Sequence, residues 1–164
     1  MSYFATSIGA AASLVPVSVD RLAEILEEQD PPLHFGYSDD RSRLGGFWDD
    51  HLVEFIFRGE VLQIRAHWGR PLAEDHTPEL LEWLNTRNWQ WIWPKLYVER
   101  DDDDGLAVAA EHSINYEHGA SDEQLLLHVQ CAIATSLAAF RELDHKFPQA
   151  VEAFRAEHPD WCDE

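Results

Sequence analysis

The sequence predicts a single α+β domain in which helices pack on an antiparallel sheet. Segments 52–57 and 61–68 both have the composition of β-strands, and only the turn at 58–60 separates them. A connection this short joins antiparallel strands, because parallel strands need a long crossover. Further along, a capping box at 121–124 opens a long helix with one apolar stripe. Strands in neighbouring blocks with helices around them indicate the α+β class.

Length and composition favour one globular domain with an acidic surface. The chain has 164 residues, 45% of them hydrophobic, and its seven Trp and eight Phe predict an aromatic-rich core. The 31 Asp and Glu against 12 Lys and Arg give a formal net charge of −19. This charge repels phosphate backbones and anionic membranes, so we expect neither nucleic acid nor a membrane as a partner.

The amino-terminal residues and the cysteines indicate a cytoplasmic protein. Residues 1–19 are uncharged and lack the basic region of a secretory signal. Gly9 and Pro16 interrupt their apolar residues, and no run approaches the roughly 18 residues that suggest a membrane span. The two cysteines, Cys131 and Cys162, lie too far apart in the chain to indicate a disulfide framework, and we expect Cys131 to be buried in a helix.

The first half of the chain is predicted to hold one helix and a run of strands. The helix covers 18–29, with Ser18 as its N-cap, and the prolines that follow end it. In chain order, the β-rich segments are 35–37, 44–48, 52–57 and 61–68. In the last of these, apolar residues alternate with Gln63, Arg65 and His67, as in a sheet with one covered face.

The second half is predicted to alternate between helix and strand. Thr77, as N-cap, and Pro78 open a second helix that ends before Pro94. Strands follow at 95–100 and 106–112, with the turn 101–105 between them. The long helix then runs from the capping box to Phe147-Pro148, and 151–156 add a short helix before an acidic tail. The stripe of the long helix consists of Leu126, Val129, Ile133, Leu137, Phe140 and Leu143.

These elements give the order helix, three or four strands, helix, two strands and long helix, or α-β-β-β-α-β-β-α in its simplest form. We expect an irregular amino-terminal arm at 1–17, one α+β domain at 18–147, and a short helix with an acidic tail at 148–164. No internal repeat or long linker divides the chain.

No catalytic, cofactor or metal motif is recognisable. The phosphate-binding patterns GxGxxG and GxxxxGK[ST] and the hydrolase signatures GxSxG and HExxH are absent. The nine histidines include no pair four residues apart on a predicted helix. The acidic run at 101–105 is only part of a calcium loop, because Arg100 takes the first ligand position. We therefore expect no catalytic residue, no cofactor and no bound metal, and a charged hairpin turn at 101–105.

The most unusual segment, 83–95, contains four Trp within eleven residues, with Asn, Arg and Lys among them. Two interpretations remain open. It is either a binding surface, because aromatic residues dominate interfaces, or a helix end packed on the sheet with Asn side chains satisfying the backbone. The candidate binding residues in and near this segment are Trp68, Arg70, Asn85, Asn88, Trp89, Trp93 and Lys95.

Five stretches of the sequence occur in a characteristic order. They are Phe35-Gly36-Tyr37, 62–68, Leu84-Asn85 with Asn88, 93–98, and Gly119 with 121–125. In this order they resemble the YbjN family of bacterial sensory-transduction regulators over about residues 20–147. The resemblance implies an α+β fold similar to type III secretion chaperones, which are homodimers that bind other polypeptides. It supplies no catalytic residues.

Three functions are compatible with these observations. The first is a non-catalytic binding or regulatory protein that holds a polypeptide in a chaperone-like manner. The second is a sensor for an anionic small molecule near Trp68, Arg70, Asn88 and Lys95, because cations in an acidic chain are suited to an anion.

The third is an enzyme of unrecognised type in which His67, Glu111 and His112 converge.

For the homodimer, the uncharged arm and the Trp-rich segment are the contact surfaces that avoid repulsion between two acidic chains.

Overall fold

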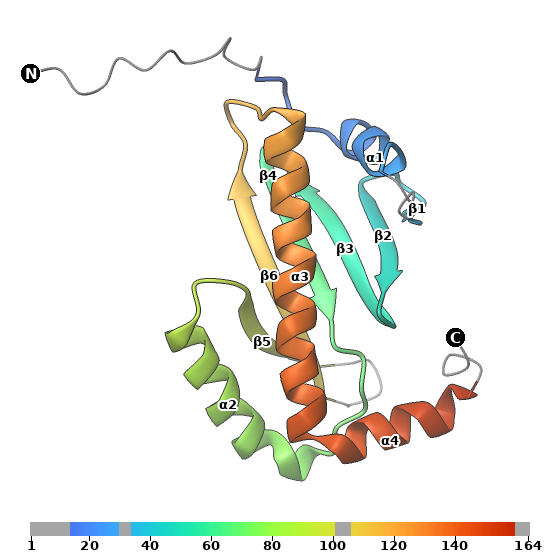
Figure 1. The fold of residues 1–164 in the computed structure, drawn as a ribbon, viewed down its shortest axis with the longest axis vertical. Coiled ribbons are helices and arrows are strands. Elements are labelled where there is room, and N and C mark those ends of the chain that lie inside the picture. The colour runs from blue at the N-terminus through green and yellow to red at the C-terminus, as the bar shows by residue number, and fades with distance from the viewer. Residues whose placement is uncertain (1–13, 30–33, 101–105, 160–164) are drawn as a thin grey trace, which may run out of the picture.

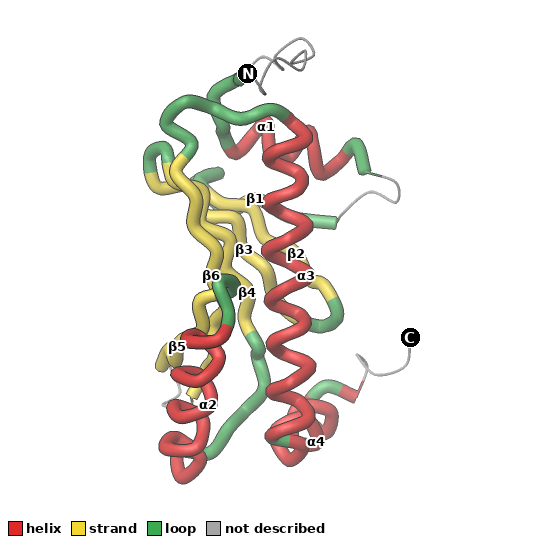
Figure 2. Tube along the Cα trace, turned by 60° about the vertical axis from the view of Figure 1, so that its left-hand side comes forward, coloured by secondary structure: helices red, strands yellow, loops and turns green. Residues whose placement is uncertain are grey.

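Six strands form one antiparallel sheet, and the long helix α3 lies across one of its faces (Figure 1, Figure 2). The computed structural model describes residues 14–29, 34–100 and 106–159. Its elements, in chain order, are α1 (Val19–Glu27), β1 (Gly36–Tyr37), β2 (Arg43–Trp48), β3 (His51–Arg58), β4 (Val61–His67), the 3₁₀ turn η1 (Glu74–His76), α2 (Thr77–Gln90), β5 (Lys95–Arg100), β6 (Leu106–Asn115), α3 (Asp122–Lys146) and α4 (Pro148–Glu157). No helix in these ranges is long and apolar enough to cross a membrane.

The sheet has the order β1-β2-β3-β4-β6-β5, and all neighbouring strands are antiparallel. In the central strand β4, Ile64 lies opposite Phe55 of β3 on one side and His112 of β6 on the other. These residues belong to the core face, which the helices cover. Arg65, the next residue along, belongs to the opposite, outer face, because successive side chains of a strand point to opposite sides.

Helix α3 closes the core over β4 and β6. Its capping box is formed as predicted, because the Ser121 hydroxyl accepts the Gln124 backbone N–H and the Gln124 side chain accepts the Ser121 N–H. At the other end, the fully buried Trp68 donates its indole N–H to Asp144 at 2.8 Å, which ties α3 to the end of β4. The buried residues of α3 are Leu125, His128, Val129, Ala132, Ser136, Ala139, Phe140 and Leu143.

The other helices pack beside α3. Helix α1 lies near its first turn, where Arg21 forms an ion pair with Asp122. Helices α2 and α4 lie on opposite sides of its carboxy-terminal end (Figure 1). Lys146 of α3 forms an ion pair with Glu79 of α2, and α4 begins directly after the buried Phe147.

The structure confirms the predicted class and most of the predicted elements. Strand β5 has the predicted bounds, and the hairpin between β3 and β4 turns at Gly59, whose φ of +62° favours glycine. The apolar residues of α1 face the core, since Leu22 and Leu26 are fully buried. The periodicity of apolar residues along the chain was sufficient to predict these elements, because each of them buries one face.

Several boundaries and positions differ from the predictions. Of the three or four strands expected before α2, four are present, because Gly36–Tyr37 pairs with β2. Strand β6 continues to Asn115 because it pairs with β4 beyond the predicted end. Helix α2 includes Thr77, whose hydroxyl donates to the Glu74 carbonyl instead of capping the helix. Helix α4, at Pro148–Glu157, is longer than the predicted segment.

One buried position was also predicted wrongly, because Cys131 is exposed. The predicted turn at 101–105, residues 1–13 of the arm and the last residues of the tail lie outside the described residues. The division into arm, domain and tail therefore stays a prediction.

The packing of α3 can be tested with a large-to-small substitution. Phe140→Ala should lower the free energy of unfolding by about 3–5 kcal/mol, because Phe140 is fully buried and its loss leaves a cavity. Leu127→Ala, on the same helix but 66% exposed, should change it by about 0.5 kcal/mol or less. Urea unfolding followed by circular dichroism measures both values. Equal losses in the two variants would mean that α3 presents a different face to the sheet.

Candidate functional site

A groove runs along the side of α3 that faces β6 and the connection between α2 and β5. Two cavities, of about 370 Å³ and 440 Å³, line up along it and share Trp93 as a wall. We call them the histidine cavity and the tryptophan cavity, and together the α3 groove. The histidine cavity is lined by Trp93, His112, Ile114, Tyr116, Gly119, Gln124, Leu127, His128 and Cys131, and the tryptophan cavity by Gln90, Trp91, Ile92, Trp93, Thr135 and Ala138.

One stripe of α3 contributes to both cavities. Its residues lie three or four positions apart, a spacing that places them on one side of a helix. From Gln124 to Ala138 the stripe is about 21 Å long, at a rise of 1.5 Å per residue. The stripe consists of Gln124, Leu127, His128, Cys131, Thr135 and Ala138.

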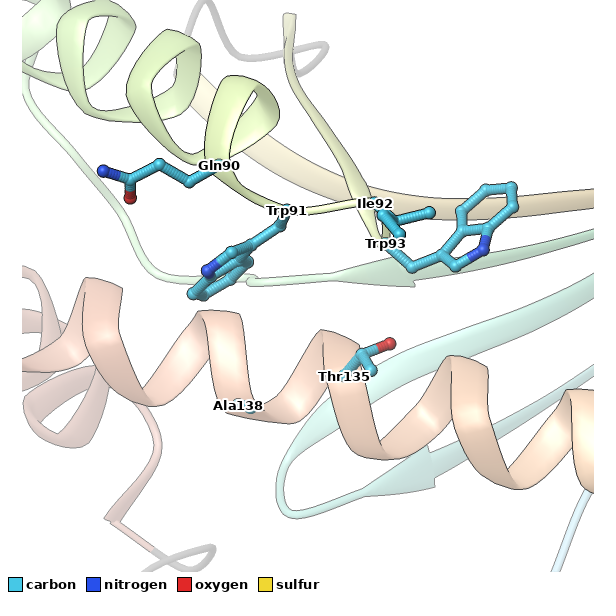
Figure 3. A pocket seen from close by; sticks show the side chains of 6 residues that line it. All are labelled: Gln90, Trp91, Ile92, Trp93, Thr135 and Ala138. Carbon is cyan, nitrogen blue, oxygen red and sulfur yellow. The ribbon is translucent and has the colours of Figure 1, made fainter.

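The groove is open because β5 starts too late to cover the end of β6. Lys95, the first residue of β5, pairs with Glu111, so β6 has no partner from β5 beyond that point. The chain before Lys95 leaves the sheet to join α2. Figure 3 shows Trp91 and Trp93 on this connection, with Thr135 and Ala138 on α3 across from them.

The Trp-rich segment divides between core and surface. Trp83 and Trp91 pack against the core, and the Arg87 guanidinium lies 5.4 Å and 5.1 Å from the centres of their rings. Arg87 also forms an ion pair with Glu142, so this part of the segment joins α2 to α3. Trp89, in contrast, is 86% exposed and lines neither cavity. The packing interpretation therefore holds for Trp83 and Trp91, whereas Trp89 is outside the core.

Asn88 holds the connection in place. Its amide Nδ2 donates to the Leu96 carbonyl at 2.7 Å, and its Oδ1 accepts the Leu96 backbone N–H at 2.8 Å. The side chain thus takes the place of a neighbouring strand at the edge of β5 and fixes the last turn of α2 there. Asn85, one turn earlier, is exposed.

His112 is buried at the boundary between the two cavities. Its ring stacks on Trp93, with 4.6 Å between the ring centres and an angle of 18°. Its Nε2 lies 2.8 Å from the Thr135 hydroxyl, which in turn donates to the Cys131 carbonyl at 2.8 Å. Because a hydroxyl has one proton, a Thr135 hydroxyl that donates to the Cys131 carbonyl accepts from His112 Nε2–H.

His128 lies beside His112, with 6.0 Å between the two ring centres. Its Nδ1 is 2.9 Å from the Tyr116 hydroxyl oxygen, and its Nε2 is buried with no hydrogen-bond partner in the described part of the chain. Burial lowers the pKa of His128 to about 4, and burial together with the neighbouring His128 lowers the pKa of His112 to about 4. Both imidazoles are therefore neutral at pH 7.

Residues 18–145 match the YbjN family model, described as "Putative bacterial sensory transduction regulator". This chain belongs to the YbjN family. Among curated protein sequences, no relative matches it.

Solved structures share the fold of this YbjN-family chain at low sequence identity. The structure titled "Crystal structure of YbjN, a putative transcription regulator from E. coli" has a TM-score of 0.66 and 17% identity, and the match covers 82% of this chain and 96% of that one. An uncharacterized protein from Methanothermobacter thermautotrophicus has a TM-score of 0.51 and 11% identity, covering 80% and 99%. A chain of the HopA1-SchA chaperone-effector complex has a TM-score of 0.48 and 20% identity, covering 76% and 88%.

Besides Asn85, Asn88 and Trp89, three further candidate residues of the sequence analysis line neither cavity of this YbjN-family chain. Trp68 is fully buried in the core, and Arg70 is buried with its guanidinium 4.0 Å from the centre of the Phe154 ring. Lys95 is exposed and shares the outer face of the sheet with Glu111. None of the three lines either cavity, whereas Trp93 lines both.

The predicted cluster of His67, Glu111 and His112 is not formed, because the sheet separates its members. His67 and Glu111 lie on the outer face, where His67 is 3.0 Å from Glu54 and Glu111 accepts the Tyr97 hydroxyl at 2.8 Å. His112 points to the core face. Within the described ranges, no group of three or more His, Cys, Asp or Glu side chains is arranged to hold a metal ion.

Sequence reasoning found Trp93 but missed His128 and Tyr116. His128 occupies a core position of the long helix, between Leu125 and Ala132 in the buried stripe. A histidine in such a position is a detectable signal, because a buried imidazole needs hydrogen-bond partners. Its partner Tyr116 follows the end of β6 and was not within any predicted element.

The role of Asn88 can be tested against Asn85. Asn88→Ala should lower the free energy of unfolding by about 2–4 kcal/mol, because it leaves two backbone groups of Leu96 without their partner. Asn85→Ala should change it by about 0.5 kcal/mol or less. Thermal and urea unfolding measure the change in the free energy of unfolding for both variants. The same small effect in both variants would contradict a positioning role for Asn88.

The two buried histidines predict a pH dependence of stability. Their pKa values rise from about 4 in the folded state to 6.5 on unfolding, so the unfolded chain binds more protons between these values. The free energy of unfolding should therefore fall as the pH is lowered from 6.5 to 4, by a few kcal/mol attributable to this pair. The buried His51, whose pKa burial also lowers, adds to this fall in all variants.

The measurement is urea unfolding at a series of pH values. The variant His112→Gln/His128→Gln should lose part of the slope between pH 4 and 6.5, and His118→Gln, at an exposed position, should keep it. A slope identical in all three proteins would contradict neutral, buried imidazoles in the histidine cavity.

Proposed function

We propose that this YbjN-family chain is a non-catalytic binding protein that holds a segment of another polypeptide in the α3 groove. The observation that carries the proposal is the composition of the groove. Among the described residues, those that line the groove include no Asp, Glu, Lys or Arg, although the chain has a net charge of −19. An uncharged, aromatic-lined concave surface on such an acidic molecule is suited to take up apolar side chains.

The rim of the groove supports the same function. Ile92 is 90% exposed and Leu127 is 66% exposed, so both lose apolar contact with water when a partner covers them. Trp93 lies between the two cavities with 39% of its surface exposed. A large aromatic residue at the centre of an apolar surface is the usual position of a binding hot spot.

The dimensions of the groove indicate the length of the polypeptide segment that it binds. About 21 Å of α3 corresponds to roughly six residues of extended chain, at about 3.3 Å per residue. Alternate side chains of an extended segment point the same way, roughly 7 Å apart, so one side chain can enter each cavity. The net charge of −19 favours Lys or Arg on either side of these two anchors.

The groove favours this function over an anionic ligand. No cationic side chain within residues 14–29, 34–100 and 106–159 lines either cavity, and burial keeps His112 and His128 neutral at pH 7. An anion would therefore enter without a charged partner, which is costly in a buried site.

The groove can be tested with variants at exposed positions. We expect a random peptide library selected on the wild type to yield peptides with two large apolar residues at i and i+2, flanked by Lys or Arg. Ile92→Asp and Leu127→Asp should each weaken these peptides more than about tenfold, because each buries a charge on binding.

Leu81→Asp is the matched control. Leu81 is an exposed apolar residue of α2 outside both cavities, so its substitution should change the affinity less than about twofold. Calorimetric titration of the selected peptides measures the three affinities. No selected peptide, or equal weakening in all three variants, would contradict the proposal.

The homodimer is a separate proposal, which rests on the family resemblance and on the frequency of twofold dimers among soluble proteins. Light scattering at micromolar concentration should give the mass of two chains for the wild type and for Ile92→Asp. A monomer mass for the wild type would contradict the dimer. A monomer mass for Ile92→Asp alone would mean that a second copy occupies the groove, which would contradict the polypeptide function.

A further inference from the structure

We propose that residues 1–13 of the chain's own amino-terminal arm occupy the α3 groove, with Phe4 and Ile8 as the two anchoring side chains. The arm then competes with the polypeptide partner and lowers the affinity of the groove for it. The regulation of partner binding rests on the proposed function, but the occupancy of the groove by the arm can be tested without any partner.

The first described residues, Leu14 and Val15, lie at one end of the groove. Val15 pairs with Ala120 in an isolated antiparallel bridge, in which the Val15 N–H donates to the Ala120 carbonyl at 3.2 Å and the Ala120 N–H donates to the Val15 carbonyl at 3.0 Å. Gly119, the residue before Ala120, lines the histidine cavity. A Cβ atom at Gly119 would lie 2.5 Å from the Val15 carbonyl oxygen, so this close approach requires glycine. Residues 1–13 therefore join the described chain beside the histidine cavity.

Arg21 of α1 holds this junction in place. Its Nη1 donates to the Val15 carbonyl at 2.7 Å and its Nη2 to the Ala120 carbonyl at 2.9 Å. The same guanidinium forms an ion pair with Asp122, and the Arg21 side chain is mostly buried. Hydrogen bonds from a charged donor are stronger than neutral ones, so residues 1–13 start from a fixed point at the groove.

Residues 1–13 are long enough to cover both cavities. The stripe of α3 from Gln124 to Ala138 is about 21 Å long. Ile8 precedes Val15 by seven residues, which span about 23 Å when extended, and Phe4 precedes it by 11 residues, which span about 36 Å. Ile8 can therefore reach the histidine cavity and Phe4 the more distant tryptophan cavity.

The spacing of Phe4 and Ile8 suits a groove with two cavities. In an extended segment, side chains four residues apart project to the same side, here about 13 Å from each other. This separation is within the length of the groove, so both side chains can enter it, one toward each end. Tyr3, next to Phe4, projects to the opposite side of such a segment.

Composition favours residues 1–13 over the other segments that lie outside the described residues. Residues 1–13 contain no Asp, Glu, Lys or Arg, whereas 30–33, 101–105 and 160–164 each contain Asp. A carboxylate that enters an uncharged groove loses its hydration without gaining a charged partner, which is costly. Phe4 and Ile8 instead bury apolar surface there.

The short connection makes even weak contacts effective. Five residues separate Ile8 from Leu14, and a linker of this length holds its ligand at an effective concentration of about 1 mM. For a segment whose Kd as a separate peptide is about 0.1 mM, the groove is then occupied in about nine of ten molecules. The apparent affinity for a partner falls about tenfold.

The exposed thiol of Cys131, which lines the histidine cavity, reports whether the groove is covered. In the full chain with Cys162→Ser, Cys131 is the single thiol, and its modification by a neutral aromatic disulfide reagent is followed by absorbance. Adding Phe4→Ser/Ile8→Ser should accelerate the modification about tenfold, because both anchors are lost. Tyr3→Ser, the matched control, should change the rate less than about twofold. Equal rates in all three proteins would overturn the proposal.

Dilution distinguishes the chain's own arm from the arm of a second copy. Contacts within one chain do not depend on protein concentration, so the protection of Cys131 should stay constant between about 1 and 100 micromolar. Protection that disappears on dilution would mean that a second copy's arm occupies the groove, and it would overturn the proposal.

Peptide binding separates this inference from the proposed function. The selected peptides should bind Phe4→Ser/Ile8→Ser about tenfold more tightly than the wild type, and Tyr3→Ser with unchanged affinity. Peptides that bind all three equally, together with equal rates at Cys131, would refute the role of the arm and leave the polypeptide function in place. Faster modification of Cys131 in Phe4→Ser/Ile8→Ser, without any peptide binding, would support the arm as the occupant and refute the polypeptide function.

Discussion

The burial of one side of α3 against β4 and β6 is the interaction on which the remaining structure depends. Val129, Phe140 and Leu143 are fully buried there, and the core of the domain closes around them. Trp68 anchors the end of the helix through Asp144, so α3 has a defined direction across the sheet. Once this side is buried, the neighbouring side of the same helix necessarily lies along the exposed end of β6. The core and the groove are therefore two sides of one helix.

The groove depends on a second constraint, which is the late start of β5. Because β5 begins opposite Glu111, β6 has β4 as a partner at His112 but no partner from β5 there. The connection from α2 fills part of this gap with Trp91 and Trp93, and Asn88 holds it there through Leu96. Core packing ends at this edge. What remains is a concave surface that is apolar like a core and accessible like a surface.

The distribution of charge distinguishes this surface from the outer face of the sheet. The outer face of the sheet carries charges in ion pairs, such as Arg65 with Glu99 at 3.1 Å. In the part of the chain that the structure describes, no Asp, Glu, Lys or Arg lines the α3 groove, and its two histidines are kept neutral by burial. The match to the family model establishes the family and the similarity to solved structures supports the fold, while the proposed binding function rests on this contrast between an acidic molecule and an uncharged groove.

The sequence by itself determined the features that depend on neighbours along the chain. The alternation at 61–68, the capping box at 121–124 and the strand at 95–100 were predicted because period, caps and turns are local properties. The tertiary structure alone decided which side chains meet across the groove. His112, Tyr116 and His128 come from a strand, a loop and a helix, and only the position of α3 on the sheet brings them together. Periodicity marked the site of Cys131 as core, but a helix that covers a sheet leaves its flank open where the sheet ends, and this edge is not encoded in any local pattern.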